Sequence, residues 1–170
     1  LAAGNGSLIV STDEGRVHCF ASGENPSPKA VKVVGDPEAF DDHPQRDLYR
    51  QVARRIVDES KATKGYGLVL GGDTGQLAYE LSRMTDLQLV ALEKDPDRLR
   101  VARQKLLSAG LLGSRVVVEP WEIDSLPPYF ANLVVSNALS GTGATGVTRD
   151  QAERVMRPGG STAAMVTPDG

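Results

Sequence analysis

The second half of the chain alternates short apolar runs with longer segments in which apolar residues recur at helical spacing. The apolar runs have the length of buried strands, and they occupy residues 66–70, 87–92, 115–119, 133–136 and 161–166. The helical segments between them occupy residues 76–84, 96–109 and 148–156. Repeated strand–helix units predict an α/β fold with a doubly wound, mostly parallel sheet and helices on both faces.

A further helix precedes this alternation, over residues 45–63. Its apolar positions recur every three or four residues and are Leu48, Val52, Ala53, Ile56 and Val57. A stripe of that width predicts one buried face, and the arginines beside it are most simply a solvated face. We expect the helix to end near Thr63, before Lys64 and Gly65.

The N-terminal residues have the period of two that is typical of strands. Residues 7–11 and 16–20 are strand-like runs joined by Thr12-Asp13-Glu14-Gly15, which supplies the residues of a turn. We therefore predict a β-hairpin extension within residues 1–22. A lone hairpin is marginally stable in water, so it must pack against something else.

A linker is predicted for residues 23–44, which are rich in Pro, Gly, Ser and Asp. One short strand at 30–34 is the regular element that we expect in it. The α/β domain then occupies residues 45–170. Because the chain begins with Leu rather than Met, we expect it to be a fragment of a longer protein.

The composition is that of a soluble globular protein, with 40% hydrophobic residues, 24% charged residues and a net charge of −3. No apolar run approaches the roughly 18 residues that span a bilayer. Cys19 is the only cysteine, which excludes an internal disulfide and a cysteine-based zinc site. His18 and His43 have no ligand partners at metal spacing, so we interpret both as structural or exposed and expect no metal. The mild acidity argues against nucleic acid as the main partner.

The strongest local signal is the turn Gly71-Gly72-Asp73-Thr74-Gly75, between the first strand of the alternation and the helix after it. A glycine-rich turn of this kind presents backbone N–H groups to a ligand. Its order does not match G-x-G-x-x-G, which disfavours a nicotinamide dinucleotide, and it lacks the G-K-[ST] of a P-loop. In doubly wound sheets, ligands bind beyond the carboxyl ends of the strands, which is where this turn lies.

Three further groups fall at the ends of neighbouring strands. Glu93 closes the second strand, and its two oxygens match the vicinal hydroxyls of a ribose. Trp121-Glu122-Ile123 follows the third strand and could frame a flat base, while Ser136 and Asn137 end the fourth. Simpler interpretations stay open: a solvated acid for Glu93, a loop carboxylate for Glu122, a core or lid aromatic for Trp121, and a strand-end cap for Asn137.

Five segments occur in the order and spacing of a known family. They are VLGGDTGQLA, VALEKDPDRLRVAR, WEIDSLP, ANLVVSNAL and RVMRPGG, at residues 69–78, 90–103, 121–127, 131–139 and 154–160. Taken together, the chain from about residue 45 to residue 166 resembles the class I S-adenosylmethionine-dependent methyltransferases. The resemblance implies a Rossmann-like methyltransferase fold and S-adenosylmethionine as the cofactor.

The resemblance also implies a set of cofactor contacts. The positions concerned are Gly71, Gly72, Asp73, Gly75, Glu93, Lys94, Trp121, Glu122, Ile123 and Ser136. By resemblance, the turn glycines let the backbone approach the methionine moiety and Glu93 binds the ribose. Glu122 would accept from the adenine amino group, with Lys94 beside the base and Ile123 or Trp121 against its face. Ser136 and Asn137 fall at the mouth of the substrate site.

The chain departs from the family pattern at several positions. Asp73 stands where the family has the middle glycine of the turn, and Val69 where it has an acid that contacts the cofactor's amino group. Asn132 replaces the acid at the start of the fourth strand, and the usual last β-hairpin is absent or was cut away. The Asn-Pro-Pro-Tyr of amide methyltransferases is here Asn-Ala-Leu-Ser at 137–140, so amide N-methylation is not supported. Residues 141–146 are most simply a flexible loop or a lid.

The N-terminal segment carries a second resemblance. GSLIVSTDEGRVHCFA, residues 6–21, is similar to one blade repeat of a PQQ-like (quinoprotein-type) β-propeller. One repeat cannot close a propeller, so the resemblance implies a longer parent chain that contains the remaining blades. An ordinary hairpin is the alternative.

Two functions follow as expectations. The first is methyl transfer from S-adenosylmethionine to an unidentified acceptor, which requires alignment more than a catalytic dyad; a general base cannot be named, although Asp73 or residues 136–140 could serve. The second is a degenerate, non-catalytic methyltransferase fold that acts as a structural or partner-binding insert in a propeller protein. An active enzyme predicts the cytoplasm, and the propeller context predicts the periplasm or export.

Overall fold

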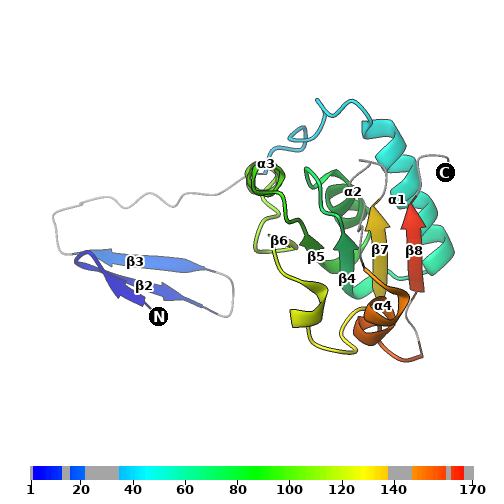
Figure 1. Ribbon diagram of the computed structural model, residues 1–170. Coiled ribbons are helices and arrows are strands. Elements are labelled where there is room, and N and C mark those ends of the chain that lie inside the picture. Colours follow the sequence, from blue (N-terminus) through cyan, green and yellow to red (C-terminus); the bar gives the residue numbers. More distant parts are fainter. Residues whose placement is uncertain (1, 13–15, 22–34, 138–146, 160–161, 167–170) are drawn as a thin grey trace. The chain divides into compact units, whose positions relative to one another are not determined.

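A computed structural model describes residues 2–12, 16–21, 35–137, 147–159 and 162–166 of the chain (Figure 1). The chain divides into two compact units, Leu1–Lys32 and Val33–Gly170, and each is described here by itself. No helix in the described part of the chain is long and apolar enough to cross a membrane. The strand predicted at 30–34 and the loop predicted at 141–146 lie outside the described residues.

The N-terminal unit is a three-stranded antiparallel sheet in the order β1-β2-β3, with β1 at Ala2–Gly4, β2 at Ser7–Ser11 and β3 at Val17–Ala21. The predicted hairpin of the second and third strands is confirmed, with the last strand one residue later than expected. The first strand was not predicted because Ala-Ala-Gly lacks β-branched and aromatic residues.

Apolar side chains of this unit are exposed on both of its faces. Leu8 pairs with Phe20 on one face, and Ile9 pairs with Cys19 on the other. Phe20 is 59% exposed and Ile9 is 44% exposed. An antiparallel sheet that stands alone in water usually has at least one polar face, so this pattern is typical of a sheet with neighbours on both sides.

The second unit is an α/β fold whose five strands pair in the order β6-β5-β4-β7-β8, each neighbouring pair parallel (Figure 1). This confirms the predicted doubly wound parallel sheet. In chain order its elements are α1 (Arg46–Ser60), β4 (Lys64–Leu70), α2 (Gln76–Met84), β5 (Asp86–Leu92), α3 (Pro96–Ser108), β6 (Val116–Glu119), the short 3-10 helix η1 (Ile123–Ser125), β7 (Leu133–Asn137), α4 (Arg149–Val155) and β8 (Thr162–Val166).

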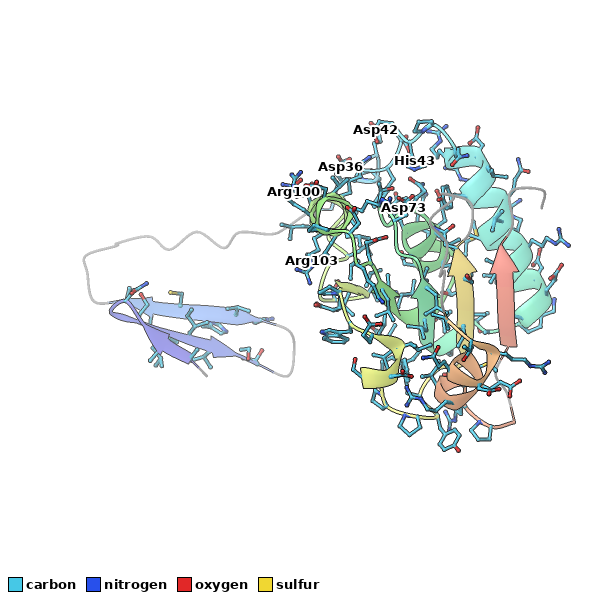
Figure 2. All side chains as sticks on the ribbon, viewed as in Figure 1. Asp36, Asp42, His43, Asp73, Arg100 and Arg103 are labelled. Atoms are coloured by element: carbon cyan, nitrogen blue, oxygen red, sulfur yellow. The ribbon has the colours of Figure 1, made fainter. Side chains whose placement is uncertain are left out.

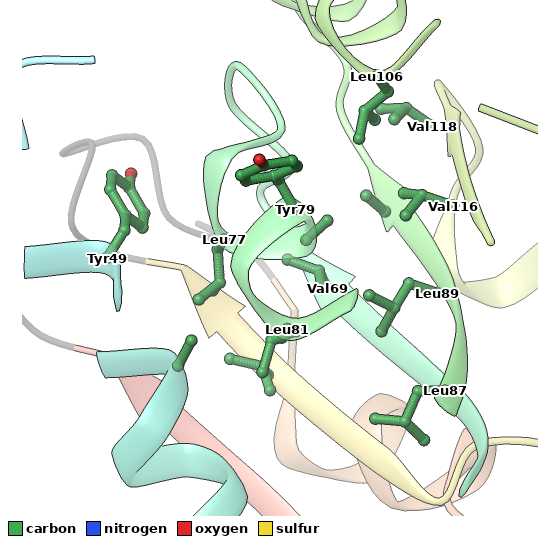
Figure 3. Packing of buried hydrophobic residues seen from close by; sticks show 14 of the residues in the cluster. Tyr49, Val69, Leu77, Tyr79, Leu81, Leu87, Leu89, Leu106, Val116 and Val118 are labelled. Atoms are coloured by element: carbon green, nitrogen blue, oxygen red, sulfur yellow. The ribbon is translucent and has the colours of Figure 1, made fainter. Parts of the chain in front are cut away.

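Both faces of the sheet carry buried side chains. Alternate residues of each strand point to opposite faces. On one face, Val69 of β4 packs with residues of α1, α2 and α3 in the larger core cluster (Figure 3). On the other face, Leu68 and Leu70 pack with Ile123 of η1 and Val155 of α4. The apolar runs of the sequence therefore correspond to strands covered from both sides.

The order of the strands reverses direction at the central strand β4. After the central strand β4 the chain moves outward to β5 and β6, then returns to the other side of β4 to form β7 and β8. The carboxyl edge between β4 and β7 is therefore the switch point at which such sheets bind ligands.

Part of the predicted linker belongs to the α/β unit. Phe40 is completely buried in the larger core cluster, with its ring centroid 4.4 Å from that of Tyr79. Backbone hydrogen bonds fix the same segment, since the Asp36 N–H donates to the carbonyl of Ser108 at 2.7 Å. Proline, glycine and aspartate content predicted a loop here, but it gave no sign that one aromatic ring anchors the loop.

Helix α1 ends at Ser60, earlier than the predicted Thr63. Lys61 takes a left-handed conformation with φ of 58°, and its N–H donates to the carbonyl of Val57. That hydrogen bond closes the last turn of the helix. Strand β4 then begins at Lys64, two residues before the predicted start.

Candidate functional site

The turn between β4 and α2 has the backbone that its glycines predict. Gly71 and Gly75 have φ of 74° and 87°, the left-handed region that glycine adopts without strain. Gly72 lies against the end of β5, where a Cβ would come within 3.3 Å of the Cβ atoms of Ala91 and Glu93. The Gly72 N–H donates to the carbonyl of Leu92 at 2.8 Å. The turn is thus held directly against the carboxyl end of the neighbouring strand.

Glu93 connects this turn to the loop after β5. Its side chain is buried, and its Oε2 accepts the N–H of Asp73 at 2.6 Å. Its Oε1 accepts the N–H of Asp95 at 2.9 Å. An ionised carboxylate oxygen can accept two hydrogen bonds, so each oxygen keeps capacity for one more donor. The structure therefore brings Glu93 and the turn together, as the sequence predicted from their positions at strand ends.

The predicted base-binding residues separate into two groups. Lys94 and Glu122 form an exposed ion pair, with Nζ 2.6 Å from Oε2, and this pair joins the loops after β5 and β6. Trp121 beside them is 47% exposed. Ile123, in contrast, is 4% exposed and packs in the core cluster under α4. Ser136 lies on β7 directly opposite Leu70 of β4 and is half-buried.

Asn132, which replaces an acid of the family pattern, has a structural contact. Its Oδ1 accepts the N–H of Tyr66 at 3.1 Å, and its own N–H donates to the carbonyl of Tyr66 at 2.7 Å. These bonds align the start of β7 with β4, away from the carboxyl edge.

Tyr49 of α1 is a residue at this edge that sequence reasoning did not single out. Its side chain is fully buried, and its Oη donates to Oδ2 of Asp73 at 3.4 Å. Asn137, at the end of β7, donates from Nδ2 to the same Oη at 3.4 Å. Burial raises the pKa of Tyr49 to about 12. The phenol is therefore a neutral donor throughout the physiological range, and it connects α1 to the glycine turn and to the end of β7.

His43 lies next to Tyr49 and was predicted only to be structural or exposed. Its ring meets the Tyr49 ring edge-on, with centroids 5.2 Å apart. Figure 2 shows His43 and Asp73 at the same end of the sheet, beyond the heads of the strand arrows. Burial lowers the pKa of His43, and the negative charge of Asp73 opposes that shift. Nδ1 accepts the N–H of Gln45 at 3.1 Å, so the neutral ring carries its hydrogen on Nε2.

Two buried acceptors at the turn have no hydrogen-bond partner among the described residues. They are Oγ1 of Thr74 and Oε1 of Gln76, although Nε2 of Gln76 donates to Glu80 at 3.2 Å. Buried polar atoms in native proteins nearly always have a partner, so an orphaned pair at one edge indicates that a ligand or water supplies it. In the described ranges, no group of three or more His, Cys, Asp or Glu could hold a metal ion.

Comparison with known proteins gives a consistent result for the fold. No family model and no curated protein matches the sequence. A putative S-adenosylmethionine-dependent methyltransferase from Methanococcus maripaludis superimposes with a TM-score of 0.62 at 18% identity, covering 84% of this chain and 68% of that one. An S-adenosylmethionine-dependent methyltransferase from Aquifex aeolicus superimposes with a TM-score of 0.59 at 18% identity, and the match covers 75% of each chain. The chain has the methyltransferase fold.

The methyltransferase fold is not restricted to one reaction. The cyclase SpnF also superimposes, with a TM-score of 0.51 at 19% identity, covering 65% of this chain and 42% of the cyclase. Similarity at this level of identity shows architecture, and the chemistry must be argued from the site. The likeness of residues 1–22 to a propeller repeat receives no support from these comparisons and stays a prediction.

Proposed function

We propose that the α/β unit is an S-adenosylmethionine-dependent methyltransferase domain that binds its cofactor at the carboxyl edge of β4 and β5. One observation carries the proposal. At the carboxyl end of β5, next to the central strand that borders the switch point, the Glu93 carboxylate accepts the N–H of Asp73 and fixes the glycine turn beside itself. A nucleoside held by Glu93 would then lie next to backbone N–H groups of the turn.

The remaining contacts follow from where each residue lies. Glu93 would accept ribose hydroxyls with its remaining capacity, while Gly71, Gly72 and Gly75 allow the ligand to approach the backbone. The exposed Lys94–Glu122 pair and Trp121 would border the base. Ile123 would support that region from the core side. Ser136 would lie at the methyl end, because β7 ends on the far side of β4.

The bound cofactor would supply an electrophilic methyl group. The chain's own task is then to bind, align and exclude water, which requires no catalytic dyad. Tyr49 remains protonated, donates to Asp73 and accepts from Asn137. His43 would present an Nε2–H donor rather than a free base, because Nδ1 is already occupied by the Gln45 N–H. The acceptor of the methyl group stays unassigned.

A second function is favoured by one specific observation. Val69 stands at the position of an acid in the family pattern, and it is 1% exposed within the core cluster. A domain that had lost cofactor binding would act as a structural or partner-binding unit instead. The three-stranded sheet, apolar on both faces, fits a parent protein in which further sheets pack on it, as in a β-propeller. Catalysis is compatible with the cytoplasm, and the propeller alternative with the periplasm or export.

Thermal unfolding with S-adenosylhomocysteine separates the two functions. At 100 times its dissociation constant, a ligand that binds only the folded state adds about 2.7 kcal/mol to the free energy of unfolding. We expect wild-type protein to show a concentration-dependent shift and Glu93→Ala to lose most of it. Glu59→Ala is the matched control, since Glu59 is an exposed carboxylate that pairs with Arg55 on α1. It should keep the full shift.

The outcomes against the proposal are distinct. Absence of any shift in wild-type protein at millimolar ligand would favour the non-catalytic alternative. A shift that survives in Glu93→Ala would place the ribose elsewhere. Unfolding without ligand is measured for each variant, because Glu93→Ala also leaves the N–H groups of Asp73 and Asp95 without their acceptor.

A further inference from the structure

We infer that Asp73 binds the ammonium group of the cofactor's methionine moiety, and that this carboxylate takes over a task that position 69 cannot perform. The inference rests on the proposed function and deepens it. It concerns the amino-acid end of the ligand, whereas Glu93 concerns the nucleoside end. The ammonium group is a compact cation that must find acceptors when it leaves water.

Position 69 offers no acceptor. Val69 has an aliphatic side chain, and it packs among residues of α1, α2 and α3 on the covered face of the sheet. Another group at the same edge must therefore receive the positive charge. A ribose at Glu93 leaves the rest of the ligand to extend from β5 across the turn toward β7, since β4 separates those two strands. Asp73 is connected to both ends of that path, by its N–H to Glu93 and through Tyr49 to Asn137 at the end of β7.

The backbone and the side chain of Asp73 contact different elements. With φ of 47°, it is one of the few non-glycine residues in the left-handed region. Its N–H donates to Glu93, toward β5, while its Oδ2 accepts from Tyr49 of α1 at 3.4 Å. The carboxylate therefore lies on the α1 side of the turn, at the end opposite to the ribose acceptor.

The charge of Asp73 is not neutralised within the described residues. No Lys or Arg in that part of the chain forms an ion pair with it, and Arg50, the residue after Tyr49 on α1, pairs with Glu80 and Asp47 instead. A half-buried carboxylate with one long hydrogen bond has capacity for a cationic partner. The carboxylate of the methionine moiety would be repelled from the same place, so the orientation of the amino acid is also determined.

Neighbouring acceptors add to this interpretation. An ammonium group has three N–H donors. Thr74 follows Asp73 in the turn, and Gln76 is the first residue of α2. Each carries a buried side-chain oxygen with no partner among the described residues. A cation bound at Asp73 would bring its remaining N–H donors to this part of the turn.

The test compares two ligands by isothermal titration calorimetry on the full chain. S-adenosylhomocysteine carries the amino-acid end, and methylthioadenosine has the same adenosyl thioether without it. Asp73→Asn removes the charge, keeps the shape and tolerates the left-handed backbone, and Asp73→Gly restores the residue of the family pattern. Asp97→Asn is the control, because Asp97 is an exposed carboxylate in the first turn of α3, near the same edge.

We expect both Asp73 variants to weaken S-adenosylhomocysteine by about tenfold or more, the usual effect of losing a charge-assisted hydrogen bond. Methylthioadenosine should bind all proteins alike, and Asp97→Asn should bind both ligands like wild type. Equal effects of the Asp73 variants on the two ligands, or no effect on either, would overturn the inference while the nucleoside site stands. Wild-type protein that binds methylthioadenosine but not S-adenosylhomocysteine would show that Asp73 repels the amino acid. If wild type binds neither ligand, the proposed function fails and the inference with it.

Discussion

At the scale of single residues, Tyr49 illustrates how burial changes the pKa of a side chain. Its phenol lies between Asp73 and Asn137 with no exposed surface. In an unfolded chain such a phenol ionises near pH 10.0, whereas burial raises the pKa in the folded protein to about 12. Folding therefore favours the protonated form. The stabilisation is complete below the unfolded pKa and is lost as the pH rises through the folded one.

This difference predicts an alkaline loss of stability that depends on one hydroxyl. Between pH 10 and pH 12, the free energy of unfolding of the wild type should fall more steeply than that of Tyr49→Phe, by on the order of 2 kcal/mol over the interval. Urea denaturation at a series of pH values measures both slopes. The slopes are compared rather than the absolute values, because Tyr49→Phe also removes two hydrogen bonds. Parallel slopes would show that the phenol is not buried as described.

Sequence reasoning named some residues of the candidate site and did not name others, for a physical reason. Glu93 and the glycine turn follow directly from the alternation of strands and helices, since strand ends meet at one edge of a parallel sheet. Tyr49 and His43 were missed because their contacts with the turn depend on how α1 and the segment before it rotate against α2. The position of Ile123 in a sequence motif predicted that it lies near the base. In the structure its side chain packs in the core cluster that contains Val155 of α4.

At the scale of elements, the segment before α1 shows how one side chain can hold an irregular stretch. Phe40 stacks on Tyr79 of α2, and the Nζ of Lys105 of α3 lies 5.5 Å from the centre of its ring. The Tyr79 hydroxyl donates to the carbonyl of Pro37 at 2.7 Å. The segment thereby links α2 to α3.

Truncating this ring should destabilise the α/β unit strongly. Phe40→Ala is expected to lower the free energy of unfolding by about 3–5 kcal/mol, the usual cost of deleting a buried phenylalanine. Phe20→Ala, at an exposed phenylalanine of the three-stranded sheet, should change the same transition by less than about 0.5 kcal/mol. Urea denaturation followed by circular dichroism measures both. Similar small effects would mean that residues 35–44 are a true linker.

Strands and helices of the α/β unit could be predicted because buried parallel strands are continuous apolar runs. The residues at which these elements begin and end were harder to predict. Helix α1 ends at a left-handed lysine, which no residue preference announces, and β1 is too short and too poor in β-branched residues to be recognised. Such details depend on particular backbone hydrogen bonds, from Lys61 to Val57 and between β1 and β2, rather than on composition.

At the scale of the whole molecule, the two units differ in how they are stabilised. The α/β unit has core clusters on both faces of its sheet. The strands of the N-terminal unit leave Leu8, Ile9, Val17 and Phe20 exposed. A small sheet of this kind has little buried apolar area with which to offset the entropy of ordering its chain.

We therefore predict that a chain beginning at Val33 unfolds cooperatively at the temperature of the complete chain, within about 2 °C. It should also keep the stabilisation by S-adenosylhomocysteine that the complete chain shows. A peptide of residues 1–32 should show no cooperative transition. Circular dichroism during heating measures all three. A midpoint lowered by more than about 5 °C in the shortened chain would mean that the N-terminal unit contributes to the stability of the α/β unit.

The Tyr49 hydroxyl, which meets both Asp73 and Asn137, also has a thermodynamic consequence for the whole domain. Any ligand that steadies the turn would reduce local opening of the first long helix, because the two share this contact. Linkage makes the effect reciprocal: a partner whose affinity for the helix is changed by the bound ligand changes the affinity for that ligand by the same factor. A protein that docks on the outer surface of α1 could then regulate the cofactor site without approaching it.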